Sequence, residues 1–393
     1  MNKQIISLIK LLCTVYLVVI IPKIISNHNK QKKVIIDNTK TEYITSLENL
    51  IKNKASFYWL KNQNLALFCE NIDTEIINTL INNRFKLKQV FILNNNNNNI
   101  KILNKNIKIL TWDNYQKNNI KSIFKNIDSI IFNVKNTGLR GDNCFNNLLE
   151  LMELNLKINK KMVILDQPNP VAKYIEGPGQ IPLQHGLTTG ELAQYFNNYI
   201  LKKPINLSVI PMIGWQRANY IDNTENTQQK MLLSLLNEIK PINLNLDNTL
   251  SSQALLFPKN SLTPWEINRL KLIFSKFGLD SQNYFYKDIK NNIELSGVKI
   301  NKIHDLNNFS YFNSMLTVAT FLKNRKNIKL NYSDSFYKIL ASKETKDFLM
   351  DNINYETFRN KTEKSLQDFY VKSKSFMLYK PYPEINNIKI LKI

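Results

Sequence analysis

The chain has 393 residues, which is enough for two domains. Its hydrophobic fraction of 43% and aromatic fraction of 10% are typical of a protein with a buried core, and they exclude disorder along the whole chain. Lys and Arg outnumber Asp and Glu by 53 to 31, but the lysines are scattered rather than grouped with aromatic residues. We therefore expect no nucleic-acid partner, whereas a positive surface favours an anionic polymer such as a cell wall.

Residues 1–25 have the pattern of an export signal. The basic residue Lys3 lies near the N-terminus, and an unbroken apolar run follows at residues 11–21. This segment predicts a protein that is exported to the periplasm or another extracytoplasmic place. Residues 5–25 are expected to act as a signal peptide or as an anchor in the inner membrane, the alternative being a buried helix of the folded domain. Residues 26–44 would then serve as a linker.

Residues 45–225 alternate between short apolar runs and segments with helical spacing. Strands are predicted at 65–68, 89–93, 107–111, 129–134 and 162–165, and helices at 44–51, 74–82 and 146–158. This alternation predicts an α/β, Rossmann-like N-terminal domain with a parallel sheet and right-handed crossovers. The asparagine tract 94–99 follows a strand, at the sheet edge where ligands usually bind, and is interpreted as a solvated loop.

A polar, turn-rich stretch at 222–229 marks the predicted domain boundary, and residues 230–393 are expected to form a smaller α+β C-terminal domain. In this domain Thr263 precedes Pro264, with Glu266 three positions after the threonine, which is a typical helix start. The other elements predicted here are an extended stretch reaching Phe257, a strand at 293–300, and helices at 231–239, 312–322 and 336–341.

The three cysteines show neither paired spacing nor a Cys-x-x-Cys motif. Cys13 lies in the apolar N-terminal segment, which leaves Cys69 and Cys144 for one disulfide at most. Clusters with metal-ligand spacing and glycine-rich phosphate loops are both lacking in the sequence, so we expect no metal and no cofactor.

The most informative stretch begins where the strand at 162–165 ends. Asp166 follows this strand directly, Asn169 lies in a proline-stiffened loop, and Glu176 lies further along. Such loops hold polar side chains beyond the carboxyl edge of a sheet with little loss of entropy.

The same stretch continues into a predicted helix start. Thr188 or Thr189 can cap a helix that contains Glu191 in its first turn, which places His185 just before the helix N-terminus. The helix dipole there favours a neutral imidazole or a bound anion.

These residues resemble the exo-β-N-acetylmuramidase (NamZ-type) family of peptidoglycan-degrading proteins. Its members carry an Asp-Arg-Pro-Asn-Pro loop, a Glu-Gly-Pro, and a Pro-Ile-Pro-x-Arg-His-Gly-Met-Thr-x-Gly-Glu-Leu-Ala signature. Gln167 and Gln184 replace the two arginines of these motifs. The positions that match are Asp166, Pro168, Asn169, Pro170, His185, Gly186, Thr188, Gly190, Glu191 and Leu192.

Three further segments extend the resemblance to about residues 45–380. Trp215 and Arg217 match the family's Met-x-Gly-Trp-x-Arg strand, and residues 376–379 resemble its closing Tyr-Leu-Leu-Tyr. Arg140 matches the end of a Val-Phe-Asp-Ile-Gln-Asp-Val-Gly-Ala-Arg motif. Both aspartates of that motif are asparagine in this chain, at Asn133 and Asn136.

Two departures concern the acidic residues of the family. Its Pro-Glu-His-Gly motif, whose Glu is a candidate catalytic acid, falls in the asparagine tract 94–99 of this chain. A Glu-Gly-rich loop that precedes a Pro-Trp helix in the family is missing, because the stretch 254–258 runs almost directly to Thr263. Glycoside hydrolysis normally uses two carboxyl groups, and general acid–base help is worth about 10²–10⁴-fold in rate.

Asp166 and Glu176 are the candidate catalytic carboxylates, with loop organisation as the alternative for both. The candidate substrate-binding residues are Arg140, Asn169, His185, Glu191, Trp215 and Arg217. Five of these six residues, all but Asn169, have a structural alternative. The two arginines would form salt bridges to Asp166 or Glu191, the tryptophan would belong to the core, the histidine would be bonded within its loop, and Glu191 would interact with the helix dipole.

The function implied is that of an exo-β-N-acetylmuramidase-like protein of peptidoglycan turnover that binds a sugar or muropeptide. With the departures above, we expect a degenerate relative that keeps sugar binding without normal hydrolysis. Two alternatives remain: an active glycoside hydrolase that releases N-acetylmuramic acid with Asp166 and Glu176, and an envelope-anchored scaffold with no ligand.

Overall fold

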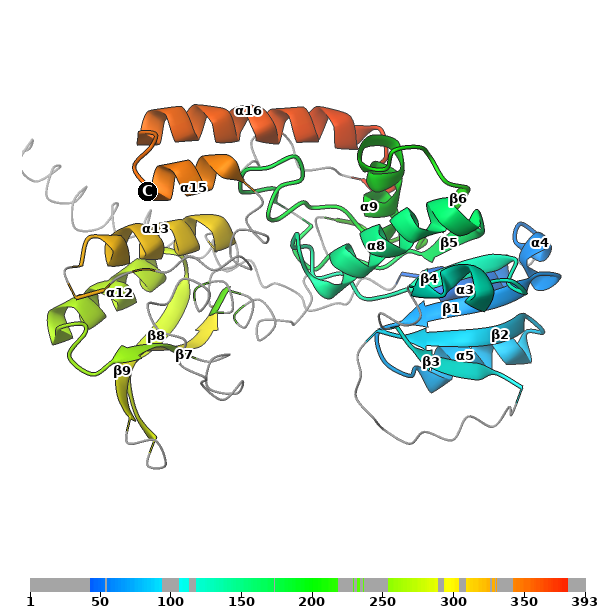
Figure 1. Ribbon diagram of the computed structural model, residues 1–393, viewed down its shortest axis with the longest axis horizontal. Coiled ribbons are helices and arrows are strands. Elements are labelled where there is room, and N and C mark those ends of the chain that lie inside the picture. The colour runs from blue at the N-terminus through cyan, green and yellow to red at the C-terminus, as the bar shows by residue number, and fades with distance from the viewer. Residues whose placement is uncertain are drawn as a thin grey trace, which may run out of the picture. The chain divides into compact units, whose positions relative to one another are not determined.

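A computed structural model (Figure 1) describes the residues 43–53, 55–93, 106–112, 118–172, 174–217, 229, 232–233, 236, 254–288, 293–303, 309–325, 327–328, 330 and 342–380. The export segment, the asparagine tract, all but the last residue of the boundary stretch 222–229 and the helix expected at 336–341 lie outside this part of the chain. Within it, no helix is both long and apolar enough to cross a membrane.

The first sheet confirms the predicted Rossmann-like fold. Its six strands are ordered β3-β2-β1-β4-β5-β6, and every neighbouring pair is parallel. This is the strand order of dinucleotide-binding domains, in which the chain reverses direction across the sheet between β1 and β4. The strands are β1 (Asn64–Cys69), β2 (Lys86–Ile92), β3 (Lys108–Thr111), β4 (Ser129–Asn133), β5 (Lys161–Leu165) and β6 (Leu207–Ile210).

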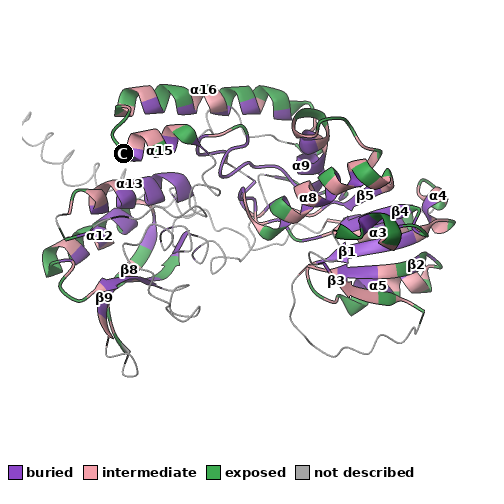
Figure 2. Cartoon of the chain, viewed as in Figure 1, coloured by how far each residue is buried: buried purple, intermediate pink, exposed green. Residues whose placement is uncertain are grey.

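Helices cover both faces of this sheet, because successive side chains of its strands point to opposite faces. Leu65 and Leu67 pack with one set of helices, whereas Ala66 and Phe68 pack with the other. The first set is α3 (Ser46–Lys52), α4 (Tyr58–Lys61) and α5 (Thr74–Asn82). The second set is α7 (Ile120–Ile123), α8 (Asn143–Ile158) and α9 (Thr189–Tyr195), which continues as the π-helical turn η2 (Phe196–Ile200). The inner strands β1, β4 and β5 are accordingly buried, while the outer helix faces are exposed (Figure 2).

A second, antiparallel sheet has the order β7-β9-β8. It consists of β7 (Ala254–Pro258), β8 (Leu279–Asp288) and β9 (Ile293–Ile303), and packs with α12 (Pro264–Lys276), α13 (Tyr311–Lys323) and α15 (Lys343–Leu349). The predicted start of α12 is confirmed, since Thr263 and Glu266 form a capping box with Pro264 in the first turn. This sheet and its helices confirm the predicted α+β character of the C-terminal half.

Helix α16 (Tyr355–Lys374) connects the cores of the two sheets. Phe358, near its start, packs with the core of the second sheet. Leu366 and Phe369, two and three turns further on, pack with the core of the six-stranded sheet. Neither α16 nor β8 nor α15 was predicted from the sequence, so the C-terminal half contains more regular structure than expected.

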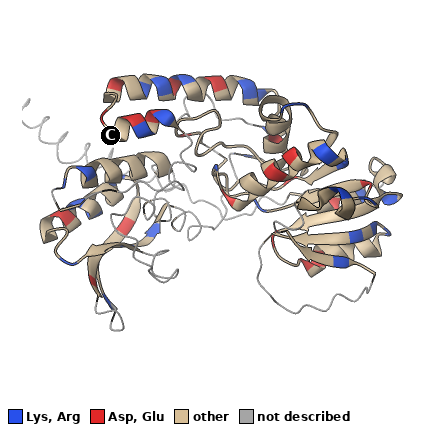
Figure 3. Ribbon diagram, in the orientation of Figure 1, with Lys and Arg blue, Asp and Glu red and all other residues tan. Residues whose placement is uncertain are grey.

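Two smaller features concern charge and cysteine. Lys and Arg side chains are distributed over helices and strands of both sheets rather than gathered on one element (Figure 3). Cys69 and Cys144 are both buried and free, so the one disulfide that their number allowed is not formed.

Candidate functional site

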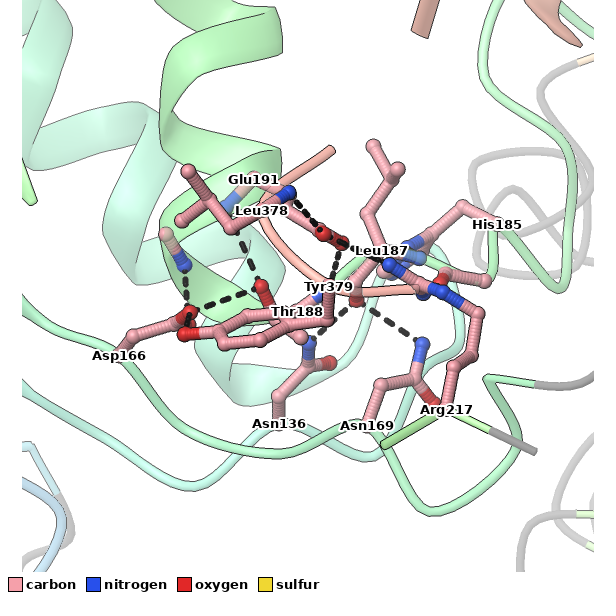
Figure 4. A network of polar contacts seen from close by, with 12 residues as sticks. Asn136, Asp166, Asn169, His185, Leu187, Thr188, Glu191, Arg217, Leu378 and Tyr379 are labelled. Carbon is pink, nitrogen blue, oxygen red and sulfur yellow. Dashed lines mark hydrogen bonds and ion pairs between the residues drawn. The ribbon is translucent and has the colours of Figure 1, made fainter. Parts of the chain in front are cut away.

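Asp166 lies at the centre of a buried polar network (Figure 4) and is 1% exposed. Its carboxylate accepts hydrogen bonds from Thr188 Oγ1 at 3.0 Å, from the Gly190 amide at 2.7 Å and from the Tyr379 hydroxyl at 2.6 Å. A Cβ at position 190 would lie 2.4 Å from Val209 Cγ1, so this close approach requires glycine. Asp166 therefore joins β5 to the start of α9 and to the C-terminal segment.

Glu191 occupies the third position of α9 and extends the same network. Its carboxylate accepts hydrogen bonds from the Thr188 amide and the Leu378 amide, each at 2.9 Å. Arg217 forms an ion pair with it at 2.6 Å and also donates to the Gly186 carbonyl, and both charged side chains are fully buried. The salt bridge that was the alternative for Arg217 is thus present, and Glu191 lies in the first turn of α9, where it completes a capping box with Thr188.

Two asparagines hold the loop that precedes α9. The side-chain amides of Asn136 and Asn169 each donate to the Leu187 carbonyl at 2.9 Å. The Leu187 amide in turn donates to Nδ1 of His185 at 3.1 Å. With Nδ1 accepting a hydrogen bond, the neutral ring carries its proton on Nε2, which has no hydrogen-bond partner and is fully buried.

Burial shifts the ionisation of these groups in opposite directions. Removal from water raises the pKa of Asp166 to about 7, and the neighbouring Glu191 carboxylate adds to the increase. Removal from water lowers the pKa of His185 to about 3, and the guanidinium groups of Arg140 and Arg217 lower it further. At neutral pH the imidazole is therefore uncharged.

Glu176 connects the loop that carries the family motifs to the core of the second sheet. It is 1% exposed, and its carboxylate accepts hydrogen bonds from Ser310 Oγ and from the Phe312 amide, the latter at 3.1 Å. These donors belong to the start of α13. The carboxylate thus stabilises the N-terminus of a helix, an arrangement that explains its burial without any ligand.

Arg140 and Trp215 also lie inside the protein. Arg140 donates to the carbonyls of Pro178 and Ile181, at 3.0 Å for the first, and burial lowers the pKa of its guanidinium to about 9. The ring of Trp215 packs edge-on against Tyr379, with 4.9 Å between ring centroids. All eight residues singled out from the sequence are 0–6% exposed, so none of them presents a side chain at the surface.

Tyr379 is a member of this network that the sequence did not reveal. Besides its bond to Asp166, its hydroxyl accepts a hydrogen bond from the Met212 amide at 2.9 Å. The resemblance of residues 376–379 to the closing motif of the family was the available signal, but it assigned no role to the tyrosine.

An open pocket of about 620 Å³ lies at the carboxyl edge of the six-stranded sheet, beside the ends of β1, β4 and β5. This edge includes the point between β1 and β4 where strand order reverses, at which ligands of such folds bind. In the wall of this pocket, the side-chain amide of Gln167 donates a hydrogen bond to Asn133 Oδ1 at 2.6 Å. The lining residues are Thr45, Ser46, Leu47, Cys69, Glu70, Asn71, Ile72, Asp73, Thr74, Glu75, Ile76, Asn133, Lys135 and Gln167.

None of the eight candidates lines this pocket. The sequence signal that would have found it is the group of polar residues at the carboxyl ends of the strands, namely Glu70 after β1, Asn133 at the end of β4, and Gln167 two positions after β5. In the described part of the chain, no group of three His, Cys, Asp or Glu side chains is placed to hold a metal ion.

Comparisons with known proteins agree on one relationship. Residues 50–231 match the family model described as exo-beta-N-acetylmuramidase NamZ, N-terminal. Over 115 residues the chain is 31% identical to the peptidoglycan beta-N-acetylmuramidase NamZ of Bacillus subtilis (strain 168). That match covers 26% of this chain and spans 28% of the length of the curated relative.

Two solved structures of DUF1343 family proteins from Bacteroides fragilis share the fold over most of the chain. The first superimposes with a TM-score of 0.69 and covers 87% of this chain and 100% of its own. The second has a TM-score of 0.62 and covers 86% and 99% respectively. Both are 18% identical to this chain, so the likeness concerns the fold.

Proposed function

Because the chain is a divergent member of the NamZ-type family, we propose that it binds a sugar or muropeptide derived from peptidoglycan without hydrolysing it as an exo-β-N-acetylmuramidase. The similarity to a peptidoglycan beta-N-acetylmuramidase supports a role in the cell envelope, outside the cytoplasm, in line with the predicted export segment. Residues 5–25 as a signal peptide or membrane anchor remain a prediction, since they lie outside the described residues.

The burial of the two candidate carboxylates carries this proposal. A glycosidase needs two carboxyl groups that flank the scissile bond and reach the substrate. Asp166 and Glu176 are each 1% exposed, and their oxygens accept hydrogen bonds from protein donors on α9, α13 and the C-terminal segment. Bringing either to a sugar would leave these donors without partners, at a cost of about 1–3 kcal/mol for each.

The pocket at the carboxyl edge supports the binding part of the proposal. Its volume of about 620 Å³ lies in the range of small-molecule sites, roughly 300–1,000 Å³. Amides at Asn71, Asn133 and Gln167, with hydroxyls at Ser46 and Thr74, line it. Such groups donate and accept hydrogen bonds, which suits the hydroxyl and acetamido groups of a hexosamine.

The residues that replace family motifs are consistent with a changed site. Asn133 and Gln167 line the pocket at positions where the family motifs have Asp and Arg. Their mutual hydrogen bond of 2.6 Å takes the place that an ion pair between those residues would occupy. Neither amide can donate or accept the proton that general acid–base catalysis requires.

A direct test measures turnover and binding on the same purified full-length protein. Release of 4-nitrophenol from 4-nitrophenyl β-N-acetylmuramide reports hydrolysis, and calorimetric titration with soluble glycan fragments of peptidoglycan reports binding. We expect binding without turnover. Turnover that is lost in Asp166→Asn or Glu176→Gln would overturn the proposal in favour of an active hydrolase. Turnover that is lost in Glu70→Gln would also overturn it, and would show that a carboxylate of the pocket takes part in hydrolysis. Absence of both signals would favour the scaffold.

A further inference from the structure

Helix α12 and strand β8 share a face on which large apolar side chains are exposed. Trp265 and Leu272 of α12 are 65% and 58% exposed, and Phe285 of β8 is 69% exposed. Side chains of this size are usually buried, and where several gather at a surface they commonly mark a binding site. This face is therefore a candidate binding surface.

A hydrogen bond between two asparagines shows how the two elements lie. The side-chain amide of Asn283 on β8 donates to Asn268 Oδ1 on α12 at 3.2 Å. A connection of two residues joins the end of α12 to the start of β8, so the elements run in opposite directions as they pack together (Figure 1). Trp265 precedes Asn268 by about 4.5 Å along the helix, and Phe285 follows Asn283 by about 7 Å along the strand. Both rings therefore lie on the same side of the asparagine pair.

The strand register places Phe285 on this face independently. Asn283 pairs with Val298 of β9 and Phe285 pairs with Ser296, and positions two apart share one face of a sheet. Val298 belongs to the core that α12 covers, whereas the intervening Tyr284 packs on the opposite face. The ring of Phe285 thus lies on the side of the sheet where α12 lies.

A cation lies beside the two rings. Arg269 is exposed one helical turn after Trp265, so the two side chains are neighbours on the outer face of α12. The Glu266 carboxylate of the same helix forms an ion pair with Arg325 at 3.2 Å. The Glu294 carboxylate of β9 forms ion pairs with two lysines, at 2.5 and 3.1 Å. Both carboxylates are therefore engaged elsewhere, and the Arg269 guanidinium can meet an anionic ligand.

The chemistry of this face suits an anionic glycan. The faces of a pyranose ring consist of C–H groups, which pack on exposed aromatic rings, while side-chain amides bind its hydroxyl and acetamido groups. A guanidinium adds a bidentate site for a carboxylate. A stable protein partner would instead need an apolar core within about 800 Å² of contact on each side. Three large apolar side chains interspersed with amides and a cation do not provide such a core.

We propose that Trp265, Phe285 and Arg269 form a second binding surface, which attaches the protein to an anionic glycan strand of the cell wall. None of these three residues lines the pocket at the carboxyl edge of the six-stranded sheet. The surface goes beyond the proposed function, because it binds a polymer whereas the pocket recognises one sugar. Each can exist without the other.

Cosedimentation of the full-length protein with insoluble peptidoglycan, freed of protein and of attached polymers, measures this attachment. Trp265→Ala and Phe285→Ala should each weaken binding about tenfold, which corresponds to about 1.4 kcal/mol for each exposed anchor. Tyr58→Ala is the matched control, since it removes a ring that is 63% exposed on α4, and it should leave binding unchanged. Losses no larger than that of Tyr58→Ala would overturn the proposal.

Salt and a second polymer test the charge of the ligand. Arg269→Gln should weaken binding to peptidoglycan severalfold and reduce its salt dependence. Arg359→Gln, at an exposed position of α16, should do neither. Chitin, a neutral insoluble glycan, should bind more weakly than peptidoglycan and should not respond to Arg269→Gln. Equal binding to the two polymers would overturn the assignment of an anionic ligand.

Other occupants of this surface would give different results. Binding to phosphatidylglycerol vesicles that is lost in Trp265→Ala, without binding to peptidoglycan, would overturn the proposal in favour of a lipid membrane. A concentration-dependent dimer that is lost in Trp265→Ala would overturn it in favour of a second copy of the chain. Absence of sugar binding in calorimetry, with attachment to peptidoglycan that still depends on Trp265, would remove the proposed function alone and support this surface.

Discussion

Asp166 and Gln167 are neighbours in the sequence, yet they belong to two different polar regions of the molecule. Asp166 faces inward, to a network in which Glu191, Arg217 and Tyr379 are all buried. Gln167 faces the open pocket, where it binds Asn133. The peptide bond between them separates a region that stabilises the fold from a region that is available to a ligand.

The two regions also differ in how they relate to the family motifs. The charged groups of the network, Asp166, Glu191 and Arg217, are motif residues that this chain retains, and the uncharged Asn136 beside them replaces a motif aspartate. The pocket wall contains two further replacements, Asn133 and Gln167. A buried charge that loses its partner is costly, whereas a half-exposed one is solvated by water, so the charges of the network have a structural reason to be retained. Retained motif residues are therefore weak evidence for catalysis in this chain.

The largest expected effect is the loss of the buried ion pair. Arg217→Met leaves Glu191 buried without its guanidinium partner, which costs about 3–5 kcal/mol. Urea unfolding measures this as a fall in the free energy of unfolding. The matched control is Arg359→Met, which removes an exposed ion pair with Glu363 on α16 and should cost less than about 0.5 kcal/mol. Equal losses of unfolding free energy in the two variants would contradict the claim that the buried ion pair contributes more to stability than an exposed one.

The next effect is a dependence of stability on pH. The pKa of Asp166 is about 7 in the folded protein, above its unfolded value of about 3.9, so the stability it contributes is lost as pH rises through 7. The pKa of His185 is about 3, below its unfolded value of about 6.5, so its contribution is lost as pH falls from 6.5. Between about pH 4 and 6.5 the two slopes oppose each other, each reaching at most about 1.4 kcal/mol per pH unit.

Single substitutions should reveal separately the pH dependence of stability that each group contributes. Asp166→Asn removes the first, so acidification from pH 6.5 to 4 should destabilise this variant relative to the wild type. His185→Gln removes the second, so the same acidification should stabilise it relative to the wild type. Chemical unfolding at several pH values gives both difference profiles, and profiles parallel to the wild type would show that these two groups do not titrate as their burial implies.

A smaller loss is expected when the C-terminal segment is detached from the network. Tyr379→Phe removes the hydroxyl that donates to Asp166 and accepts from the Met212 amide, which should cost about 1–3 kcal/mol. Tyr199→Phe, at an exposed ring of the π-helical turn, should change the stability by less than about 0.5 kcal/mol. Thermal unfolding of the two variants side by side measures the difference, and a Tyr379→Phe variant as stable as the control would contradict the assigned contact.

The smallest effect concerns the pocket wall. Asn133→Asp and Gln167→Arg together place an ion pair where two amides now meet, and their coupling in a double-mutant cycle should be about 0.2–1 kcal/mol. The value is small because both side chains are only half-buried. A coupling indistinguishable from zero would mean that the two side chains do not face each other in solution.

The sequence predicted β1, β4 and β5 well because these strands are buried on both faces and appear as short apolar runs. It did not predict β8, whose residues are mostly polar or aromatic and whose alternation is interrupted by an irregularity between Asp280 and Ser281. It did not predict α16 either, because Thr362 and Ser373 belong to the buried stripe of this helix and weaken its apolar periodicity.

For the site, the sequence located the polar residues but not their exposure. The position of Asp166 at a strand end was evident from the apolar run before it. Its burial depends on Tyr379, which lies 213 positions away in the chain, and that of Glu191 depends in part on Leu378, 187 positions away. Contacts at such separations leave no local pattern in the sequence, so a residue that is enclosed could not be told from one that faces a ligand.

These separations in the sequence also determine the order in which the contacts can form while the chain is being synthesised. At a synthesis rate of about 5–20 residues per second, the segment that supplies Leu378 and Tyr379 emerges on the order of ten to forty seconds after Glu191 and Asp166. During that interval the two carboxylates lack their last donors, and the six-stranded sheet lacks the part of α16 that covers it. The network therefore closes as a late step, after the strands that surround it have already been made.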